Sequence, residues 1–147
     1  MIAAYRLHSA RYPADEGSGA ATFGGRWNPP GMPAIYTAGS RSLAVLEILV
    51  HYAVLPRDFV MTPVEIPYRV RVEKLPLSLL PGGWRRPEAV RITQAIGKDL
   101  LARSAVLRVP SAIVPEENNY VLNPEHPDFK RIRFLAFVPF RFDARLR

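Results

Sequence analysis

The chain has 147 residues, which suits a single domain over residues 1–147. Hydrophobic residues make up 48% and charged residues 22%, a balance that excludes the disordered, collagen-like and coiled-coil classes. Cysteine is absent, which excludes a disulfide framework, a cysteine zinc site and a thiol nucleophile, and which agrees with a cytoplasmic location. The sequence shows no signal peptide, and no apolar run approaches the ~20 residues that cross a bilayer. We therefore expect a soluble protein without a membrane partner.

The formal net charge is +7, from 20 Lys and Arg residues against 13 Asp and Glu residues. Such a charge favours an anionic partner, namely nucleic acid, a phosphorylated small molecule or an acidic protein. The basic residues are scattered, and the two densest spots are the pair Arg85–Arg86 and the tail with Arg141, Arg145 and Arg147. A solvated basic face accounts for the same charge, so the charge alone selects no partner.

In chain order, alternating apolar and polar residues predict a strand over 2–8. Residues 9–31 are rich in Gly, Pro, Ser and Asp and predict a long loop, which in a domain of this size is usually functional. A short buried strand over 34–37 leads directly into a helix. Ser40 is the predicted N-cap of that helix, and Pro56 marks its predicted end.

The second half of the chain predicts one further helix and four strands. They are strands over 59–66 and 68–72, a helix from Pro87 to about Arg103, a strand over 106–113 that Pro110 interrupts, and a final strand over 131–140. The predicted class is therefore α+β, with a few helices and a mixed or mostly antiparallel sheet.

Glu47 stands alone in the stretch 43–50, where seven of eight residues are apolar. On a helix, Leu43 and Val50 share its face, and an ionised carboxylate in such surroundings is costly unless it is paired or hydrogen-bonded. Glu47 therefore either occupies a solvated stripe of the helix or lies at the floor of a cleft, where burial tunes its chemistry.

Three histidines raise the question of a metal site. His51 follows Glu47 at i+4 and shares its face, and His8 and His126 lie elsewhere in the chain. The two-histidine helical spacing of a zinc protease is absent, so we expect a core or capping role for His51 and no bound metal.

The loop over 22–31 combines residues that suit an anion. Gly24 and Gly25 let the backbone turn sharply or approach a ligand, Arg26 can fork onto a phosphate or carboxylate, and Trp27 offers a stacking face. The spacing is not that of a phosphate-binding P-loop or a dinucleotide fingerprint. A surface loop anchored to the core by Trp27 is the alternative.

Ser111, Asn119 and Asn123 are the polar residues of interest in the last third of the chain. Ser111 follows a predicted strand and a proline, at a strand end where ligand groups often bind. No serine-nucleophile spacing accompanies it, and Gly-x-Ser-x-Gly is missing. Asn119 and Asn123 are of the type that commonly stabilises turns.

Taken together, these segments resemble the RES domain family, which comprises the toxins of a bacterial toxin–antitoxin system and is named for its Arg, Glu and Ser. The matching segments follow the family's order along nearly the whole chain, whereas residues 61–105 carry no motif. They are residues 5–7, 24–28, 34–38, 43–47, 109–111 and 119–129.

The resemblance implies a fold similar to ADP-ribosyltransferases and an activity that breaks the nicotinamide–ribose bond of NAD⁺. NAD⁺ would be the substrate, and no metal or cofactor is implied. The acceptor of the ADP-ribose is left open between water, phosphate and protein. The resemblance also implies a partner, an antitoxin with an Xre-type helix-turn-helix domain, through which DNA would be contacted only indirectly.

The residue chemistry agrees with this implication. The pyrophosphate of NAD⁺ suits arginines in a Gly-rich loop and on a neighbouring strand, which are Arg26 and Arg6. Nicotinamide is a flat cation that can stack on an aromatic face, which Tyr36 would supply.

Glu47 would stabilise the positive charge that develops on the ribose as neutral nicotinamide departs. Ser111 and Asn119 would position the ribose or the amide by hydrogen bonds. The predicted catalytic residues are thus Glu47, Tyr36 and Arg26.

Two other classes of protein remain open from the residues alone. A nucleic-acid-binding or RNA-cleaving module would use the +7 charge with aromatic platforms in a basic groove, or a His-centred acid–base pair. A non-catalytic partner-binding domain would leave Glu47 with a structural role.

Overall fold

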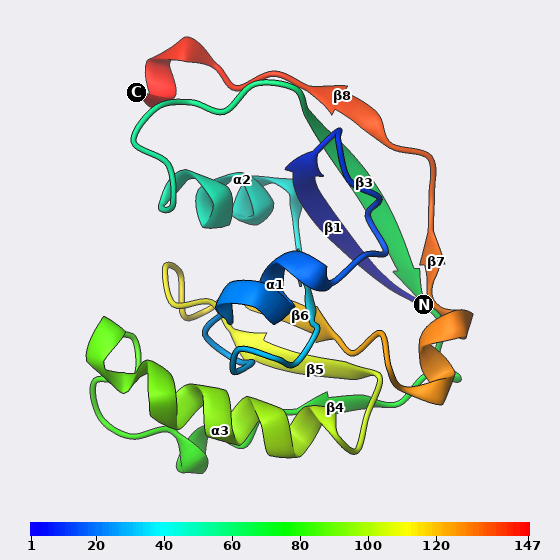
Figure 1. The fold of residues 1–147 in the computed structure, drawn as a ribbon, viewed down its shortest axis with the longest axis vertical. Helices are drawn as coiled ribbons and strands as arrows, with labels where there is room; N and C mark the ends of the chain where they lie inside the picture. Colours follow the sequence, from blue (N-terminus) through cyan, green and yellow to red (C-terminus); the bar gives the residue numbers. More distant parts are fainter.

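The computed structural model describes residues 1–147 and contains an eight-stranded sheet with three α-helices (Figure 1). The strand order is β4-β5-β6-β2-β1-β3-β7, and β8 also pairs with β3. Every pair is antiparallel except β4 with β5, so the predicted α+β class with a mixed, mostly antiparallel sheet is confirmed. The strands are β1 (Ile2–Ser9), β2 (Ile35–Ala38), β3 (Phe59–Ile66), β4 (Val72–Lys74), β5 (Val106–Pro110), β6 (Asn118–Leu122), β7 (Arg133–Phe134) and β8 (Val138–Phe140).

The sheet divides into two halves that diverge (Figure 1). β1 and β3 form one half, and β4, β5 and β6 form the other, with β2 paired along its length to β6. β1 and β2 are joined only at Tyr5 and Ala38. The helices are α1 (Ser18–Phe23), α2 (Arg41–Leu49) and α3 (Val90–Leu101), of which α2 packs on β1 and β2 and α3 packs on β5.

The first half of the chain largely follows its sequence pattern. β1 and β2 form as predicted, and the Ser40 Oγ accepts from the Leu43 amide at 3.1 Å as the N-cap of α2. The predicted end of the helix at Pro56 was wrong, because α2 ends at Leu49. The Leu49 carbonyl accepts a hydrogen bond from the Arg147 guanidinium, a partner far away in the sequence. The predicted long loop also contains the short helix α1, which has no buried residue of its own.

The second half of the chain differs more from the elements that its sequence predicts. β3 forms as predicted, but the strand predicted over 68–72 was wrong. Its residues form a turn in which the Val70 amide donates to the Pro67 carbonyl, and the strand β4 starts only at Val72. β6 was not predicted as a strand, and Asn119 lies in it rather than in a turn.

The long strand predicted over 131–140 was also wrong. A 3₁₀ helix over Pro127–Arg131 comes first, and two short strands, β7 and β8, then pair separately with β3. Pro139 lies in β8 at the outer edge of the sheet, where the lack of a backbone N–H is tolerated.

The second predicted helix is confirmed with a shifted start. Pro87 begins a 3₁₀ turn, Pro87–Ala89, and α3 continues from Val90 to Leu101. α3 buries Leu100 and Leu101 in an apolar cluster that also contains Trp27, Leu107 and Val121. No helix combines the length and the apolar character needed to cross a membrane.

Candidate active site

A cleft of about 1110 Å³ lies between α2, the loop after α1, the start of α3 and the segment that joins β5 to β6. Among its lining residues are Arg26, Tyr36, Glu47 and Asn119, which come from four separate elements. The fold therefore brings four of the six predicted site residues to one cleft.

Glu47 lies in the wall of the cleft that α2 provides. Its side chain is half-buried, while Ser42, Leu46 and Val50 form the exposed stripe of the helix. The Asn119 Nδ2 donates a hydrogen bond of 2.5 Å to the Glu47 Oε2. Burial raises the pKa of Glu47, and the Asn119 hydrogen bond and the nearby charges of His51 and Arg26 oppose that rise. The carboxylate is thus held in one orientation in partly desolvated surroundings.

Arg26 follows two glycines whose backbone the site requires. Gly24 has a φ of +75°, and a Cβ on Gly25 would lie 2.5 Å from the Tyr36 Oη. The Arg26 Nη1 donates to the Trp84 carbonyl at 2.8 Å, and the Nη2 donates to the Arg85 carbonyl at 3.1 Å. A guanidinium has five N–H groups, so three remain for a ligand in the cleft.

Tyr36 contributes its ring to the cleft but not a free hydroxyl. The Tyr36 Oη donates to the Asn28 Oδ1 at 2.6 Å and accepts from the Trp27 amide at 3.1 Å. Burial raises the pKa of Tyr36, so the phenol stays protonated. Its hydroxyl therefore fixes the backbone beside Arg26, and its ring surface is what a ligand meets.

Asn119 has one half of its amide in use. Its Nδ2 binds Glu47, whereas its Oδ1 is buried without a hydrogen-bond partner in the protein. A buried acceptor of this kind is unfavourable unless a ligand or water supplies a donor. Asn119 therefore acts on the cleft through its Nδ2, which holds the Glu47 carboxylate.

Arg6 and Ser111 are the two predicted residues that do not line the cleft. Side chains alternate along a strand, and in β1 it is Tyr5 and Leu7 that face the cleft. Arg6 instead donates from Nη2 to the Glu16 carbonyl at 3.4 Å, and burial lowers its pKa to about 10.

Ser111 is fully buried, and its Oγ accepts from the amides of Ile113 and Val114 at 3.0 and 3.1 Å. Its hydroxyl is thus used within its own turn. Sequence reasoning placed Ser111 at a strand end correctly, because β5 ends at Pro110.

Two cleft residues were missed by sequence reasoning. Gln94, in α3, donates from Nε2 to the Gly25 carbonyl at 2.9 Å, and Arg85 binds the turn after β5. Gln94 carries no signal in the sequence. Arg85 belonged to the densest basic pair, but nothing distinguished it from Arg86.

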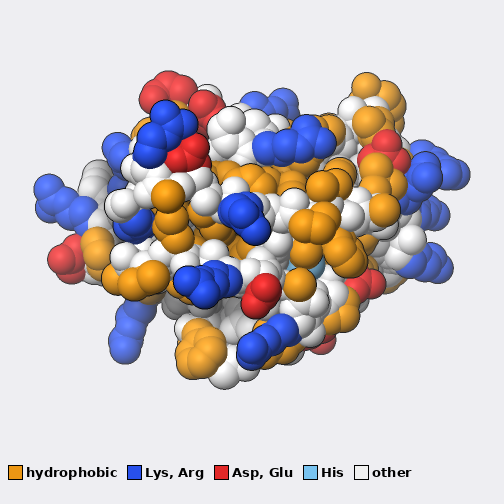
Figure 2. Space-filling view, turned by 90° about the horizontal axis from the view of Figure 1, so that it is seen from above, with side chains coloured by type: hydrophobic (Ala, Val, Ile, Leu, Met, Phe, Trp, Pro, Cys, Tyr) orange, Lys and Arg blue, Asp and Glu red, His pale blue; other side chains and the backbone are white.

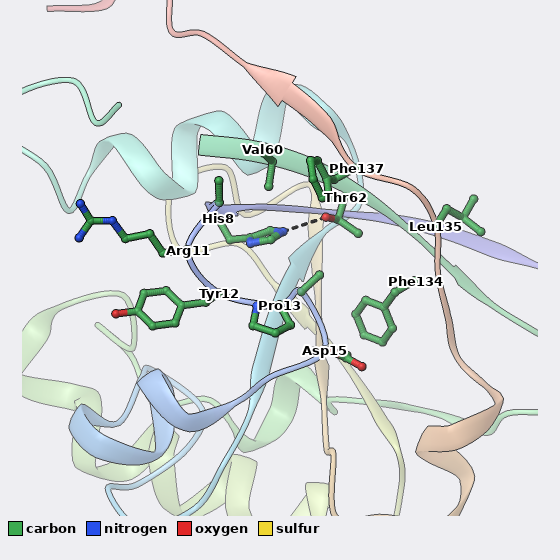
Figure 3. A pocket seen from close by; sticks show the side chains of 12 residues that line it. His8, Arg11, Tyr12, Pro13, Asp15, Val60, Thr62, Phe134, Leu135 and Phe137 are labelled. Carbon is green, nitrogen blue, oxygen red and sulfur yellow. Dashed lines mark hydrogen bonds between the residues drawn. The ribbon is translucent and has the colours of Figure 1, made fainter. Parts of the chain in front are cut away.

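The histidines take separate positions. His51 lines the cleft, and no group of three or more potential metal-ligating side chains forms. His8 lies in a second cavity of about 430 Å³ between β1, β3 and the segment before β8 (Figure 3). Its Nδ1 faces the Ser9 carbonyl and therefore donates, so its Nε2 accepts from the Thr62 hydroxyl at 2.8 Å. Burial lowers the pKa of His8, which agrees with a neutral ring. Both ring nitrogens of His8 are thus hydrogen-bonded within the protein.

On one face of the molecule the basic side chains are dispersed. Figure 2 shows Lys and Arg side chains distributed over one face with apolar surface between them, rather than gathered in a single stripe.

Comparison with known proteins gives consistent matches over nearly the whole chain. A toxin Res of Photorhabdus laumondii is 42% identical over 149 residues, which cover 97% of this chain and 95% of that protein. A Prs ADP-ribosylating toxin of Sphingobium sp. is 39% identical, over 92% of this chain and 89% of that protein. Toxins named Res from Yersinia enterocolitica and Pseudomonas putida are 39% and 38% identical.

The fold has a solved counterpart. A chain in the crystal structure of the M. tuberculosis MbcT–MbcA toxin–antitoxin complex superposes with a TM-score of 0.73, at 22% identity, over 94% of this chain and 83% of that chain. The RES domain family model matches residues 3–143. With a match of that extent and relatives at about 40% identity, the chain belongs to the RES domain family.

Proposed function

We propose that this protein cleaves the nicotinamide–ribose bond of NAD⁺ and acts as the toxin of a toxin–antitoxin pair. The observation that carries the proposal is the oriented carboxylate of Glu47, held by Asn119 in a cleft that also presents Arg26. The names of the relatives, toxin Res and Prs ADP-ribosylating toxin, support the same class of activity.

Each group in the cleft would have a role in the cleavage of NAD⁺. The three unused N–H groups of Arg26 would bind the pyrophosphate, and the ring of Tyr36 would meet the nicotinamide. The bond between ribose C1′ and the nicotinamide nitrogen breaks with its electron pair passing to the nitrogen, which makes nicotinamide neutral. The positive charge left on the ribose is stabilised by the carboxylate of Glu47. Asn119 would keep the Glu47 carboxylate in place beside the ribose through its Nδ2.

The acceptor completes the reaction. Water, phosphate or a protein side chain would attack C1′ and lose a proton, giving ADP-ribose, its phosphate ester or a modified protein. The Prs ADP-ribosylating toxin supports the last of these for at least one relative. The reaction needs no metal and no cofactor, because NAD⁺ carries its own leaving group.

The proposed partner is an antitoxin with an Xre-type helix-turn-helix domain, and the proposed location is the cytoplasm, where NAD⁺ is found. DNA would be bound by the antitoxin rather than by this chain. The toxin–antitoxin complex of the structural counterpart supports an antitoxin partner.

The test is an incubation of the purified protein with NAD⁺, with and without phosphate, and in parallel with RNA. Chromatography would measure nicotinamide release and identify the ribosyl product, and a gel would follow the RNA. We expect nicotinamide release and intact RNA. RNA cleavage without NAD⁺ loss would favour a nuclease, and inertness toward both would favour a non-catalytic binding domain.

A further inference from the structure

Ser111 is fully buried and lies outside the cleft, whereas the next two residues, Ala112 and Ile113, line it, so an effect of Ser111 on the cleft passes through other groups. Its Oγ uses both acceptor positions on the amides of Ile113 and Val114, and its own amide donates to the Glu117 carbonyl at 2.9 Å. These bonds define a tight turn in which the carbonyls of Ala112 and Ile113 remain available. Ser111 therefore determines where those two carbonyls point.

Arg85 binds both of those carbonyls. Its Nε donates to the Ala112 carbonyl at 2.6 Å and its Nη2 donates to the Ile113 carbonyl at 3.2 Å. A planar fork can bind two successive carbonyls at once, whereas the single ammonium of a lysine is a point donor on a flexible chain. The turn shaped by Ser111 is thus tied to the segment that carries Arg85.

The backbone of that segment in turn holds Arg26. The carbonyls of Trp84 and Arg85 accept from Nη1 and Nη2 of Arg26, one on each terminal nitrogen. Two acceptors fix the plane of the guanidinium before any ligand arrives, and its other N–H groups are left for the cleft. Groups held by such supporting contacts bind with less loss of side-chain freedom.

We propose that Arg85 is a positioning residue that sets the orientation of the Arg26 guanidinium, and that Ser111 acts on the cleft through Arg85. The proposal rests on the proposed function in one respect, namely that Arg26 binds the pyrophosphate of NAD⁺. The side chain of Arg85 need not contact the substrate.

The first experiment measures KM and kcat for NAD⁺ in Arg85→Ala and Arg85→Lys. We expect both variants to raise KM by about ten-fold, the effect of a weakened charge-assisted contact, and to change kcat little. Partial unfolding would instead lower kcat with KM unchanged, because it reduces only the amount of active protein. A wild-type KM in Arg85→Lys would overturn the proposal, since it would mean that positive charge alone suffices.

Arg86 provides the matched control. It is the neighbouring arginine, it is exposed, and its side chain makes no hydrogen bond in the structure. Arg86→Lys should keep the wild-type KM. An equal rise in KM in Arg86→Lys would contradict a specific role for Arg85.

The coupling to Ser111 is measured in a double-mutant cycle. If Ser111 acts through Arg85, the KM of the variant with both Ser111→Ala and Arg85→Ala rises less than the product of the two single effects. If the two substitutions instead raise KM by the product of their single effects, Ser111 does not act through Arg85.

A second readout separates this proposal from the proposed function. Hydrogen exchange of the Ile113 and Val114 amides should be faster in Arg85→Lys than in Arg86→Lys, whether or not the wild-type protein consumes NAD⁺. Faster exchange without NAD⁺ cleavage would refute the proposed function and support the contact between Arg85 and the turn after β5. Unchanged exchange would refute a role of Arg85 in stabilising that turn.

Discussion

At the scale of single residues, the site depends on a carboxylate that is held by one hydrogen bond from a neighbouring side-chain amide. Glu47 lies in an apolar stretch of a helix, and burial there disfavours its charged form. Asn119 donates to it at 2.5 Å and favours the charged form. The protonation state of Glu47 is therefore set by a balance that a single substitution can shift.

The first prediction concerns pH. The pKa of Glu47 is raised by burial above the 4.5 of an ordinary glutamate, so the carboxylate is lost as the pH falls through that raised value. NAD⁺ cleavage should show an acidic limb above pH 4.5. Asn119→Ala removes a hydrogen bond that lowers the pKa, so the limb should move to higher pH. A profile of kcat against pH measures this, and an unmoved limb in Asn119→Ala would contradict the assignment of the limb to Glu47.

The second prediction concerns Arg26. Arg26→Ala should weaken NAD⁺ binding about ten- to a hundred-fold, because a charge-assisted contact to the pyrophosphate is lost. Titration calorimetry with Glu47→Gln as the background protein measures binding without turnover. Arg86→Ala serves as the control of equal charge change, and equal affinities in the two variants would remove Arg26 from the phosphate site.

At the scale of elements, the Arg26 loop is held by close packing against α3. A Cβ on Gly97 would lie 1.9 Å from the Trp27 carbonyl, so only glycine lets the helix approach this loop. Gln94, one turn earlier in α3, donates to the Gly25 carbonyl. α3 thus supports the loop both by packing and by a hydrogen bond.

The third prediction follows from that contact. Gly97→Ala should lower the free energy of unfolding by about 1–3 kcal/mol through overpacking, despite the higher helix propensity of alanine. Gly82→Ala is the control, because a Cβ there meets nothing within 4 Å. Urea denaturation measures both. A Gly97→Ala protein as stable as the wild type would show that the loop and helix separate easily.

The elements that sequence reasoning predicted well are those with a local signal. Alternating residues indicated β1, and Ser40 before an apolar run indicated the start of α2. β6 gave no such signal, because its Asn118-Asn119 start is atypical of strands. Its pairing with β2 and β5 and the burial of Val121 and Leu122 stabilise it. The last carbonyl of α2, that of Leu49, binds Arg147, a contact that no local pattern reveals. The division of the last strand into β7 and β8 depended on pairing with β3.

The same distinction applies to the site. Glu47 and Arg26 were identifiable because a charge in an apolar run and an arginine after two glycines are unusual in themselves. The position of Arg6 outside the cleft could not be predicted, because it depends on which face of β1 the cleft occupies. Arg85 was missed because the carbonyls that it binds belong to a turn distant in the sequence.

At the scale of the whole molecule, the charge of +7 and the cleft together favour an acidic protein as inhibitor. A free enzyme that destroys NAD⁺ would harm its own cell, so we predict a tight inhibitor made alongside it. An acidic segment of an Xre-type antitoxin would be attracted by the positive charge and would compete with NAD⁺ near Arg26.

Co-expression with the neighbouring gene and pull-down test that prediction. We expect a stable complex in which NAD⁺ cleavage is inhibited competitively and in which Arg26→Ala weakens binding. A complex with undiminished NAD⁺ cleavage would exclude inhibition at the cleft, and no complex at all would contradict the toxin–antitoxin assignment.

The most direct test of the central claim compares nicotinamide release by the wild-type protein and by Glu47→Gln. The substitution keeps the volume of the side chain and removes the negative charge that the developing ribose cation requires. We expect the folded variant to bind NAD⁺ but to release nicotinamide at least about a hundred-fold more slowly. A Glu47→Gln protein that releases nicotinamide at the wild-type rate would contradict a role of the Glu47 carboxylate in NAD⁺ cleavage.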